Sequence, residues 1–354
     1  MKNTLQKPKA QKYRKINIFS FRALLFACLT VLAFGCDESS QRPSGGFDFA
    51  DMYKPRADGL DPLSEAYQVI WNGLADANPL VRVNAIEVVA TTRQIRMMPE
   101  VQRLLTDAFA PVRFAAALAV GDVKYSLARG SVGQLLKDRD ENVIIAAAYA
   151  MTRLGFREYS KVLRAAIESD DQTVRANAAF LLGKSGDKGA LELLERTLRR
   201  KDSDDKVVFL AAEAMARLGD ERIYPKLWTM LISAYADVRV TGIRAMGTLG
   251  TPEAKDALIT MLDDNVLEVR LAAAEQLGIL RDTAGERKVL DVFEKNLTTG
   301  LDNVARERVN VLTALAIGQI RTPAVVKFLP QLLKNESKFV RIAAAKAVFQ
   351  CTVR

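Results

Sequence analysis

The sequence contains no histidine in 354 residues and only three cysteines. The absence of histidine excludes Ser-His-Asp triads, Cys-His nucleophile pairs and histidine-based metal sites. Outside the N-terminal segment one thiol remains, Cys351, which is too few for a thiolate zinc site or an intramolecular disulfide. There is also no P-loop, and no Gly-x-Gly-x-x-Gly motif follows a predicted strand. We therefore predict no catalytic residues, no metal site and no cofactor, and we expect that the protein is not an enzyme.

A valine recurs along the chain with a nearly constant period. It stands at Val81, Val112, Val143, Val174, Val207, Val238, Val269, Val309 and Val340, so that successive positions differ by 31, 31, 31, 33, 31, 31, 40 and 31. An arginine follows six of these valines, as Arg82, Arg113, Arg175, Arg239, Arg270 and Arg341. A fixed period of this length indicates one supersecondary unit stacked on copies of itself, which is a solenoid.

Residues 252–280 illustrate one repeat. Pro252 opens a segment whose apolar residues recur at helical spacing as far as Leu262. Residues 263–265, Asp-Asp-Asn, then favour a turn, and a second helical pattern begins near Val269. Each unit is therefore a helical hairpin, too small to bury its own apolar face. We predict an all-α fold, an α-solenoid of about nine stacked helical hairpins over residues 61–354.

Three columns through the second helices support this packing. The residue four places after each valine is small, and the residue eight places after it is large and apolar. The residue nine places after it is small in eight repeats, but in the last repeat it is Phe349. A bulky side chain is tolerable there if no further repeat packs over it. We therefore predict that the stack ends at the last helix.

Residues 171–183, DQTVRANAAFLLG, resemble the motif Asp-x-x-x-Val-Arg-x-x-Ala-Ala-x-x-Leu-Gly of short-period HEAT-like repeats. This type of repeat is also found in phycobilisome lyases. The resemblance extends over about residues 61–354 and implies an α-solenoid, whereas such repeats serve many unrelated tasks. It also implies that the Val-Arg arginines form a ladder, in which each pairs with an acidic residue in the turn of the adjacent repeat.

The two longer steps indicate insertions in loops, near residues 199–205 and 297–302. Insertions in repeats are often found on a binding face, but they are also tolerated as plain surface loops.

The N-terminus carries seven basic residues and no acidic residue before position 23, followed by the uncharged, mostly apolar stretch 23–34 and then Gly35-Cys36. This segment resembles a bacterial lipoprotein signal, in which the cysteine is lipidated and becomes the first residue of the mature chain. We predict a signal peptide at residues 1–35 and lipidation of Cys36. An uncleaved anchor helix and ordinary cleaved secretion remain alternatives. The expected location is the cell envelope of a bacterium, on the periplasmic side of the inner or outer membrane.

Removal of the signal changes the charge balance. The whole chain carries +9, but residues 1–35 hold seven of its 51 basic residues and none of its 42 acidic residues, so the mature chain carries +2. The high positive charge is thus mainly a targeting feature, and we predict no binding to nucleic acid. Residues 36–60 contain serine, glycine and proline and show little periodicity, which predicts a flexible tether.

A candidate binding surface lies on the second helices. The residues three, six and ten places after each valine share one side and vary in polarity, so we expect an exposed concave ridge. Six candidate partner-binding residues follow from positions six and ten: Leu118, Tyr149, Phe180, Arg153, Lys184 and Arg217. An apolar stripe beside a basic one suits an amphipathic peptide with acidic flanks. Lone acids at position six, Glu87, Glu213 and Glu275, are expected to be solvated helix positions.

The leading hypothesis is a non-catalytic, lipid-anchored envelope scaffold that binds another protein or peptide through its concave face. The alternative is a lyase or chaperone-like ligand handler of the phycobilisome-lyase type, which would need a concave apolar pocket.

Overall fold

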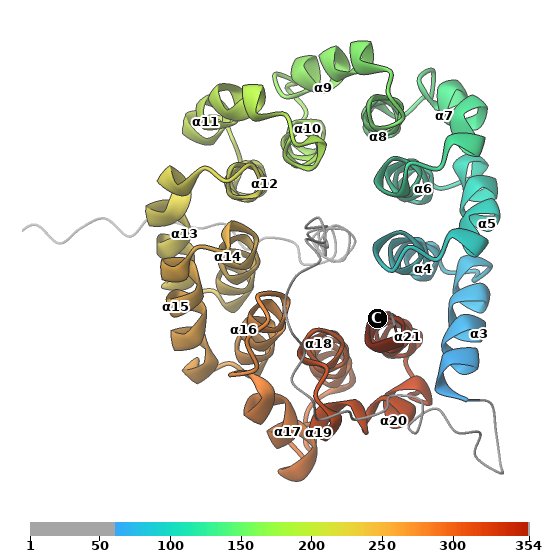
Figure 1. Cartoon of the computed structure of the whole chain (residues 1–354). Helices are drawn as coiled ribbons and strands as arrows, with labels where there is room; N and C mark the ends of the chain where they lie inside the picture. Colours follow the sequence, from blue (N-terminus) through green and yellow to red (C-terminus); the bar gives the residue numbers. More distant parts are fainter. Residues whose placement is uncertain (1–60, 353–354) are drawn as a thin grey trace, which may run out of the picture.

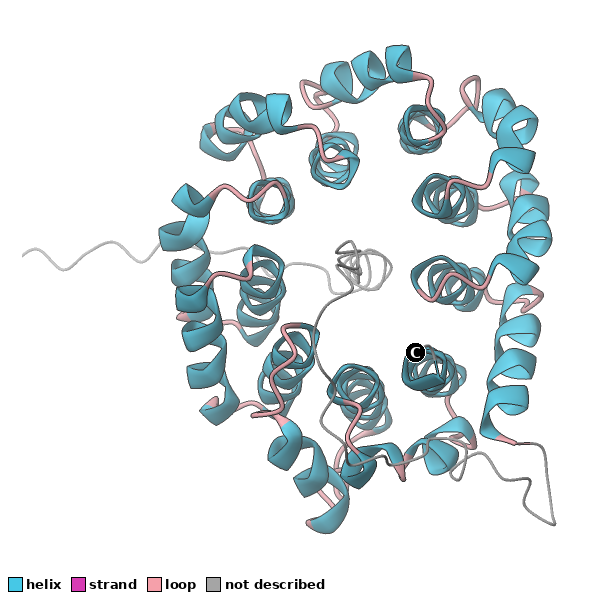
Figure 2. Cartoon of the chain, in the orientation of Figure 1, coloured by secondary structure: helices cyan, strands magenta, loops and turns pink. Residues whose placement is uncertain are grey.

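The computed structural model describes residues 61–352, and within this range every regular element is helical (Figures 1 and 2). The prediction of an all-α solenoid is therefore confirmed. The predicted signal peptide, the lipidation site Cys36 and the tether at residues 36–60 lie outside the described residues.

Nine helices form an inner layer in the described range, and most of them are seen nearly end-on in Figure 1. They are α4 (Pro79–Thr91), α6 (Ala110–Val123), α8 (Glu141–Arg153), α10 (Gln172–Ser185), α12 (Asp205–Arg217), α14 (Ala236–Leu249), α16 (Leu267–Ile279), α18 (Asn303–Ile320) and α21 (Lys338–Thr352). Each contains one of the periodic valines. The predicted second helix of every repeat is thus present.

The outer layer contains α3 (Pro62–Leu74), which is as long as several inner helices, and shorter helices, several of them extended by 3-10 turns. The shorter helices are α5 (Met98–Arg103), α7 (Arg129–Leu135), α9 (Ser160–Ala166), α11 (Leu191–Arg199), α13 (Tyr224–Leu231), α15 (Pro252–Thr260), α17 (Glu286–Glu294), α19 (Pro323–Val326) and α20 (Leu329–Leu333). Each repeat is therefore a hairpin of one outer and one inner helix, and the last repeat divides its outer part between α19 and α20.

Local sequence explains where the inner helices begin and end. The Asp171 carboxylate accepts hydrogen bonds from the backbone amides of Thr173 and Val174 and so caps α10. The same helix ends at Gly186, whose φ of 77° lies in the left-handed region that glycine adopts without strain. The periodic Val174 is buried in the first turn of this capped helix, so the cap and the valine together fix how α10 meets the core.

The small residues nine places after the valines allow the inner helices to pack closely. A β-carbon at Gly183 would lie 2.7 Å from both the Cα and the Cβ of Ala214 on the next inner helix. A β-carbon at Gly121 would lie 2.9 Å from the Cα of Ala150. Neither spacing is possible for a real side chain, so glycine is required where α10 meets α12 and where α6 meets α8.

We expect Gly183→Ala to lower the free energy of unfolding by about 1–3 kcal/mol, because the added methyl group must push α10 away from α12. Urea unfolding measures the effect. Gly133→Ala in the outer helix α7 is the matched control, since a β-carbon there would meet no atom within 4 Å. That change should raise the unfolding free energy by up to about 1 kcal/mol through helix propensity. Equal effects of the two changes would contradict the assigned packing.

The stack closes into a ring. In Figure 1 the C-terminal helix α21 lies between α18 and α4 and beside α3, the first helix of the described chain. Helix α21 packs against α3 and α4, and α20 also contacts α3. Two ion pairs cross this seam, from Lys338 Nζ to Asp76 Oδ2 at 2.6 Å and from Lys346 Nζ to Glu87 Oε1 at 2.9 Å.

The side chain of Phe349 lies at the centre of the seam. It is fully buried, and its ring centroid lies 4.9 Å from that of Tyr67 on α3. The prediction that nothing packs over Phe349 is therefore wrong. Its bulk fills the junction between the last and first repeats, where α21 packs more extensively against the outer helix α3 than against the inner helix α4. A solenoid with free ends needs a polar cap at each end, whereas here the two terminal repeats cover one another.

Candidate functional site

The arginines that follow the valines form the predicted ladder in four of the six repeats. Arg82 pairs with Asp107, Arg113 with Asp138, Arg175 with Asp202 and Arg239 with Asp264, each at 2.7–3.1 Å. Each acid belongs to the turn of the following repeat, as expected. The guanidinium groups also donate to backbone carbonyls of their own turn, such as that of Asp107 for Arg113. These arginines therefore hold neighbouring turns together.

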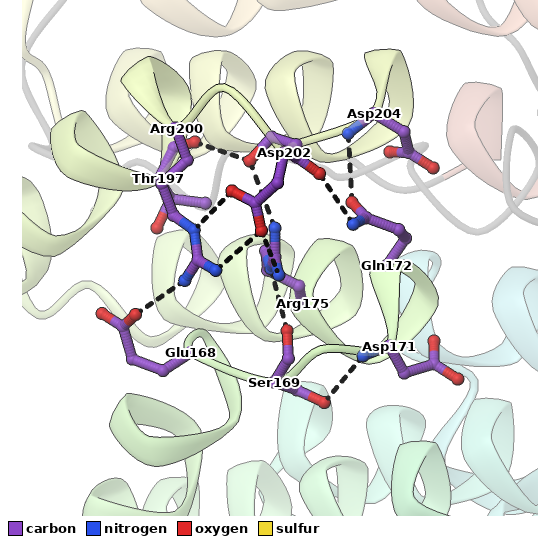
Figure 3. Close-up of polar contacts among 10 residues, drawn as sticks. Glu168, Ser169, Asp171, Gln172, Arg175, Thr197, Arg200, Asp202 and Asp204 are labelled. Carbon is purple, nitrogen blue, oxygen red and sulfur yellow. Dashed lines mark hydrogen bonds and ion pairs between the residues drawn. The ribbon is translucent and has the colours of Figure 1, made fainter.

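The longer step between Val174 and Val207 changes the sequence separation between the arginine and its acidic partner in that repeat. In the other three pairs the acid follows the arginine by 25 positions, whereas Asp202 follows Arg175 by 27, so the two inserted residues shift the acid along the chain. Figure 3 shows Asp202 between Arg175 and Arg200. Arg200 forms an ion pair with Glu168 at 2.8 Å. It also donates a hydrogen bond to Asp202, and this bond holds the pKa of Asp202 far below its ordinary value. The insertion near residue 200 thus serves the packing of two repeats.

The ladder continues across the ring closure with a different residue. Arg341 and Arg270 donate to backbone carbonyls of their own turns, those of Asn335 and Asp264. Asp76 occupies the same place in the first repeat as Asp107 does in the second, and there it accepts the ion pair from Lys338. The last repeat therefore contacts the first turn much as an interior repeat contacts its successor.

The structure places the predicted apolar patch on the inner layer but buries it. Leu118, Tyr149 and Phe180 are 7%, 1% and 3% exposed. The prediction of an exposed ridge is therefore wrong. Side chains of the same and of the adjacent inner helix cover these residues: the Tyr149 ring lies against Gly121 on α6, and Lys184 Nζ lies 5.7 Å from the centroid of the Phe180 ring. Binding of a partner by these residues stays a prediction.

The predicted basic stripe is largely paired within the protein. Lys184 Nζ lies 2.9 Å from Asp122 Oδ2, and the Tyr149 hydroxyl donates to Asp122 Oδ1 at 2.7 Å. Burial, with the negative charge of Asp122, raises the pKa of Tyr149 well above its usual value, so the hydroxyl stays protonated. Arg217 forms an ion pair with Glu213 at 2.6 Å.

Arg153 differs from the other predicted basic residues. It is half-buried, and its Nε has no hydrogen-bond partner among the described residues.

Charges from several inner helices meet near the centre of the ring. Burial raises the pKa of the Glu87 carboxyl above its ordinary value, and the positive charges of Lys346, Arg244 and Lys184 partly oppose that rise. These three cations come from α21, α14 and α10, and Figure 1 places α14 and α10 across the ring from α4. Charged side chains of α4, α10, α14 and α21, at positions six and ten after the valines, therefore lie close enough to influence one another.

Glu275 on α16 belongs to the same group. It is 1% exposed, and neither carboxylate oxygen has a hydrogen-bond partner in the described part of the chain. Burial raises the pKa of Glu275, while Arg244 and Lys346 lower it and Glu87 raises it further. Glu213 is also buried. The expectation that these position-six acids are solvated is therefore wrong.

The raised pKa of Glu275 predicts a pH-dependent stability. The folded carboxyl binds its proton more tightly than the unfolded one, so its ionisation opposes folding as the pH rises above the unfolded value. Glu275→Gln removes this cost. We expect the variant to be more stable than wild type at pH 8, with the difference shrinking towards pH 4, in thermal unfolding at both values. A variant that is less stable than wild type at pH 8 would contradict this electrostatic assignment.

Sequence reasoning missed an apolar surface on the outer layer. Trp228, Ile232 and Ile259 are 40%, 68% and 41% exposed. Trp228 on α13 and Ile259 on α15 stand at the same place in neighbouring repeats, each ten places before a periodic valine. The Tyr224 hydroxyl donates to the Glu253 carbonyl at 3.4 Å, which joins the two outer helices. The signal was available in the sequence, as large apolar residues at one outer position of consecutive repeats.

Within residues 61–352, no three His, Cys, Asp or Glu side chains are arranged to hold a metal ion. No helix in this range is both long enough and apolar enough to cross a membrane.

Solved structures with a similar backbone arrangement have low sequence identity to this protein. Human deoxyhypusine hydroxylase is 18% identical, with 74% of this chain and 98% of that chain covered and a TM-score of 0.37. The CpcE–CpcF complex of phycocyanin lyase from Nostoc sp. PCC7120 is 19% identical, with 71% and 94% covered and a TM-score of 0.39. Importin beta is 13% identical, with 79% and 45% covered and a TM-score of 0.33. No curated protein sequence matches the chain.

The fold and the ladder together define an α-solenoid of paired helices. The family model for HEAT repeats matches residues 68–152, 131–216, 160–239 and 224–313, which together span more than half of the chain. The protein therefore belongs to the HEAT repeat family.

Proposed function

We propose that this protein is a non-catalytic interaction scaffold, lipid-anchored in a bacterial envelope, that binds another protein through its outer layer. The observation that carries the proposal is the pair Trp228 and Ile259, large apolar side chains exposed on adjacent outer helices. Exposed apolar side chains that cluster in this way commonly mark interaction sites. Aromatic residues often dominate binding energy at interfaces.

The local packing supports a preformed surface. The Trp228 indole is stacked on the Tyr224 ring, with centroids 6.4 Å apart and an interplanar angle of 22°. Ile232 follows Trp228 by four positions, directly after the last residue of α13, and is exposed as well. Because rigid aromatic side chains lose little conformational freedom on binding, this cluster is suited to act as an anchor. We refer to Tyr224, Trp228, Ile232 and Ile259 as the outer patch.

Site-specific photo-crosslinking tests the outer patch. A photoreactive amino acid at Trp228 should give a discrete adduct with one polypeptide in envelope preparations. Gln102 occupies the equivalent place in the second repeat and is the matched control. Trp228→Ser should abolish an adduct formed from a photoreactive residue at Ile259. Equal adducts at positions 228 and 102, or none at either, would overturn the proposal.

The lipid anchor requires a separate test. Metabolic labelling with a palmitate analogue should tag the wild-type protein and should not tag Cys36→Ser. Labelling that persists in Cys36→Ser would remove the anchor from the proposal and leave the outer patch untouched.

The alternative, a ligand handler of the phycobilisome-lyase type, requires an apolar pocket on the concave side. The convergence of Glu87, Lys346, Arg244 and Glu275 near the ring axis does not supply such a pocket. We therefore retain the proposal of an interaction scaffold.

A further inference from the structure

The first eight inner helices are each followed by a residue with left-handed backbone conformation, twelve places after the periodic valine. A residue with a β-carbon is strained in this conformation, whereas glycine is not. In four repeats the residue is glycine, as Gly155, Gly186, Gly219 and Gly250. In the other four it is basic, as Arg93, Lys124, Arg281 and Arg321, with φ between 53° and 59°. These four basic residues therefore stand where the backbone alone favours glycine.

The four basic residues lie on one edge of the ring. Each inner helix is followed by an outer helix that returns the chain, so the inner helices run in one direction and end at the same edge, the C-terminal rim (Figure 1). Ring closure brings the repeats of Arg281 and Arg321 close to those of Arg93 and Lys124, with only the last repeat between them. We refer to these four residues as the basic rim.

The fold does not neutralise this charge. All four side chains of the basic rim are exposed. Arg93, Lys124 and Arg281 form no ion pair with another residue in the described range. Arg321 donates to the carbonyl of Gly318 in its own helix, so it too has no acidic partner there. The basic rim is therefore available to an anionic partner.

Large apolar side chains accompany the cations. Leu127 follows Lys124 by three positions and is 76% exposed, and Ile95 follows Arg93 by two positions and is 46% exposed. Both belong to 3-10 turns directly after inner helices. Cations are attracted to anionic lipid headgroups, and neighbouring aliphatic side chains enter the boundary with the acyl chains. Contacts to the nucleic-acid backbone use cations and polar groups, so exposed aliphatic side chains favour a membrane.

The first described helix begins on the same side of the ring. Tyr67, in the first half of α3, contacts Phe349 near the end of α21, and its hydroxyl donates to Gln94 just after α4. Near the end of α3, a β-carbon at Gly73 would instead lie 3.4 Å from Ile342, close to the start of α21. Helix α3 therefore starts towards the C-terminal rim, and the chain that leads back to Cys36 joins the ring there.

We propose that the basic rim, together with Leu127 and Ile95, lies against an anionic phospholipid bilayer. The cations would contact the lipid phosphates, and the two aliphatic side chains would enter the boundary between headgroups and acyl chains. This inference deepens the proposed function and rests on it in one respect, because a lipid on Cys36 would hold this rim at the membrane. The outer patch is a separate surface.

Photo-crosslinking in vesicles of phosphatidylglycerol and phosphatidylethanolamine tests this orientation. A photoreactive amino acid at Leu127 of the full chain should form a protein–lipid adduct that mass spectrometry detects. Phe109 is the matched control, because it is 51% exposed and directly precedes α6 at the opposite rim, whereas Leu127 lies just beyond the other end of that helix. Position 109 should give no adduct above background. Equal yields at the two positions, or none at Leu127, would overturn the proposal.

The double variant Arg93→Gly/Lys124→Gly isolates the charges. Glycine suits the left-handed conformation, so the variant should unfold at a temperature no lower than that of the wild type. The Leu127 adduct should nevertheless fall about fivefold for each charge removed. Arg139→Gln, which removes an exposed cation just before α8 at the opposite rim, should leave the adduct unchanged. An unchanged adduct in the double variant, or an equal loss in Arg139→Gln, would contradict the role of the basic rim.

The anchor and the basic rim can fail separately. An adduct at Leu127 in the Cys36→Ser chain with added vesicles supports the rim even if metabolic labelling removes the anchor. Labelling of Cys36 without an adduct at Leu127 would overturn the rim alone. An adduct at Leu127 with an added oligonucleotide, and none with lipid, would replace the membrane by a nucleic acid and so overturn the proposal.

Discussion

Phe349→Ala should lower the free energy of unfolding by about 3–5 kcal/mol, the usual cost of removing a fully buried aromatic side chain. The residue stands only five places from the end of the chain, where truncations are often harmless. Here its ring fills the junction between the last and first repeats against Tyr67. Urea denaturation measures the loss.

Leu127→Ala provides the control for this prediction. Leu127 is 76% exposed, so its truncation should change the unfolding free energy by less than about 0.5 kcal/mol. A loss in Phe349→Ala no larger than that in Leu127→Ala would mean that the two terminal repeats do not pack together in solution.

Arg113→Ala should be similarly damaging, with a loss of about 3–5 kcal/mol, because it leaves a buried carboxylate without its partner. Arg113 donates to both oxygens of Asp138, at 2.7 and 2.8 Å, and both side chains are 8% exposed. Arg103→Ala, which breaks an exposed pair with Glu100, should cost less than about 1 kcal/mol.

The effect of Arg113→Ala should also depend on pH. The hydrogen bond from Arg113 lowers the pKa of Asp138, so this pair stabilises the fold above the unfolded pKa of aspartate and loses that effect as the pH falls through the folded value. The difference between wild type and Arg113→Ala should therefore shrink in acid. A difference that is constant from pH 7 to pH 3 would show that Arg113 acts through packing alone.

The hairpins, their core columns and the arginine ladder could be predicted because each feature recurs at a fixed spacing. Gly121 and Gly183 occupy the same place in two repeats, and the same close contact explains both. The acids Asp107, Asp138 and Asp264 likewise follow their arginines at one spacing. Local repetition thus carries the information about contacts between adjacent repeats.

Ring closure could not be predicted in this way. The curvature of a solenoid accumulates from a small rotation per repeat, and the period of the sequence does not specify that rotation. The clearest local sign was Phe349, the one bulky residue in a column of small ones. We interpreted it as the end of a stack, because a large side chain at a free end and one at an irregular junction produce the same break in the column.

The candidate site could likewise be predicted only in part. Tyr149 and Phe180 were correctly placed on the inner side of neighbouring repeats, but periodicity does not specify the contacts that bury them, such as that of the Tyr149 hydroxyl with Asp122. Glu275 was misjudged for the same reason, since helical periodicity places it away from the interface between adjacent repeats. Its carboxylate is nevertheless buried, with Arg244 of the adjacent α14 and Lys346 and Glu87 of the two helices at the seam close enough to affect its pKa.

Zero-length cross-linking tests the closed ring most directly. A carbodiimide joins a carboxylate to an amine only when the two are in contact, and Asp76 Oδ2 lies 2.6 Å from Lys338 Nζ, although the two residues are 262 positions apart in sequence. Lys338→Arg is the matched control, because arginine preserves the charge and cannot form the amide. The closed ring predicts an Asp76–Lys338 cross-linked peptide within single chains of the wild-type protein and none in the variant. Absence of that peptide, or its appearance only between differently isotope-labelled copies, would contradict the closed ring.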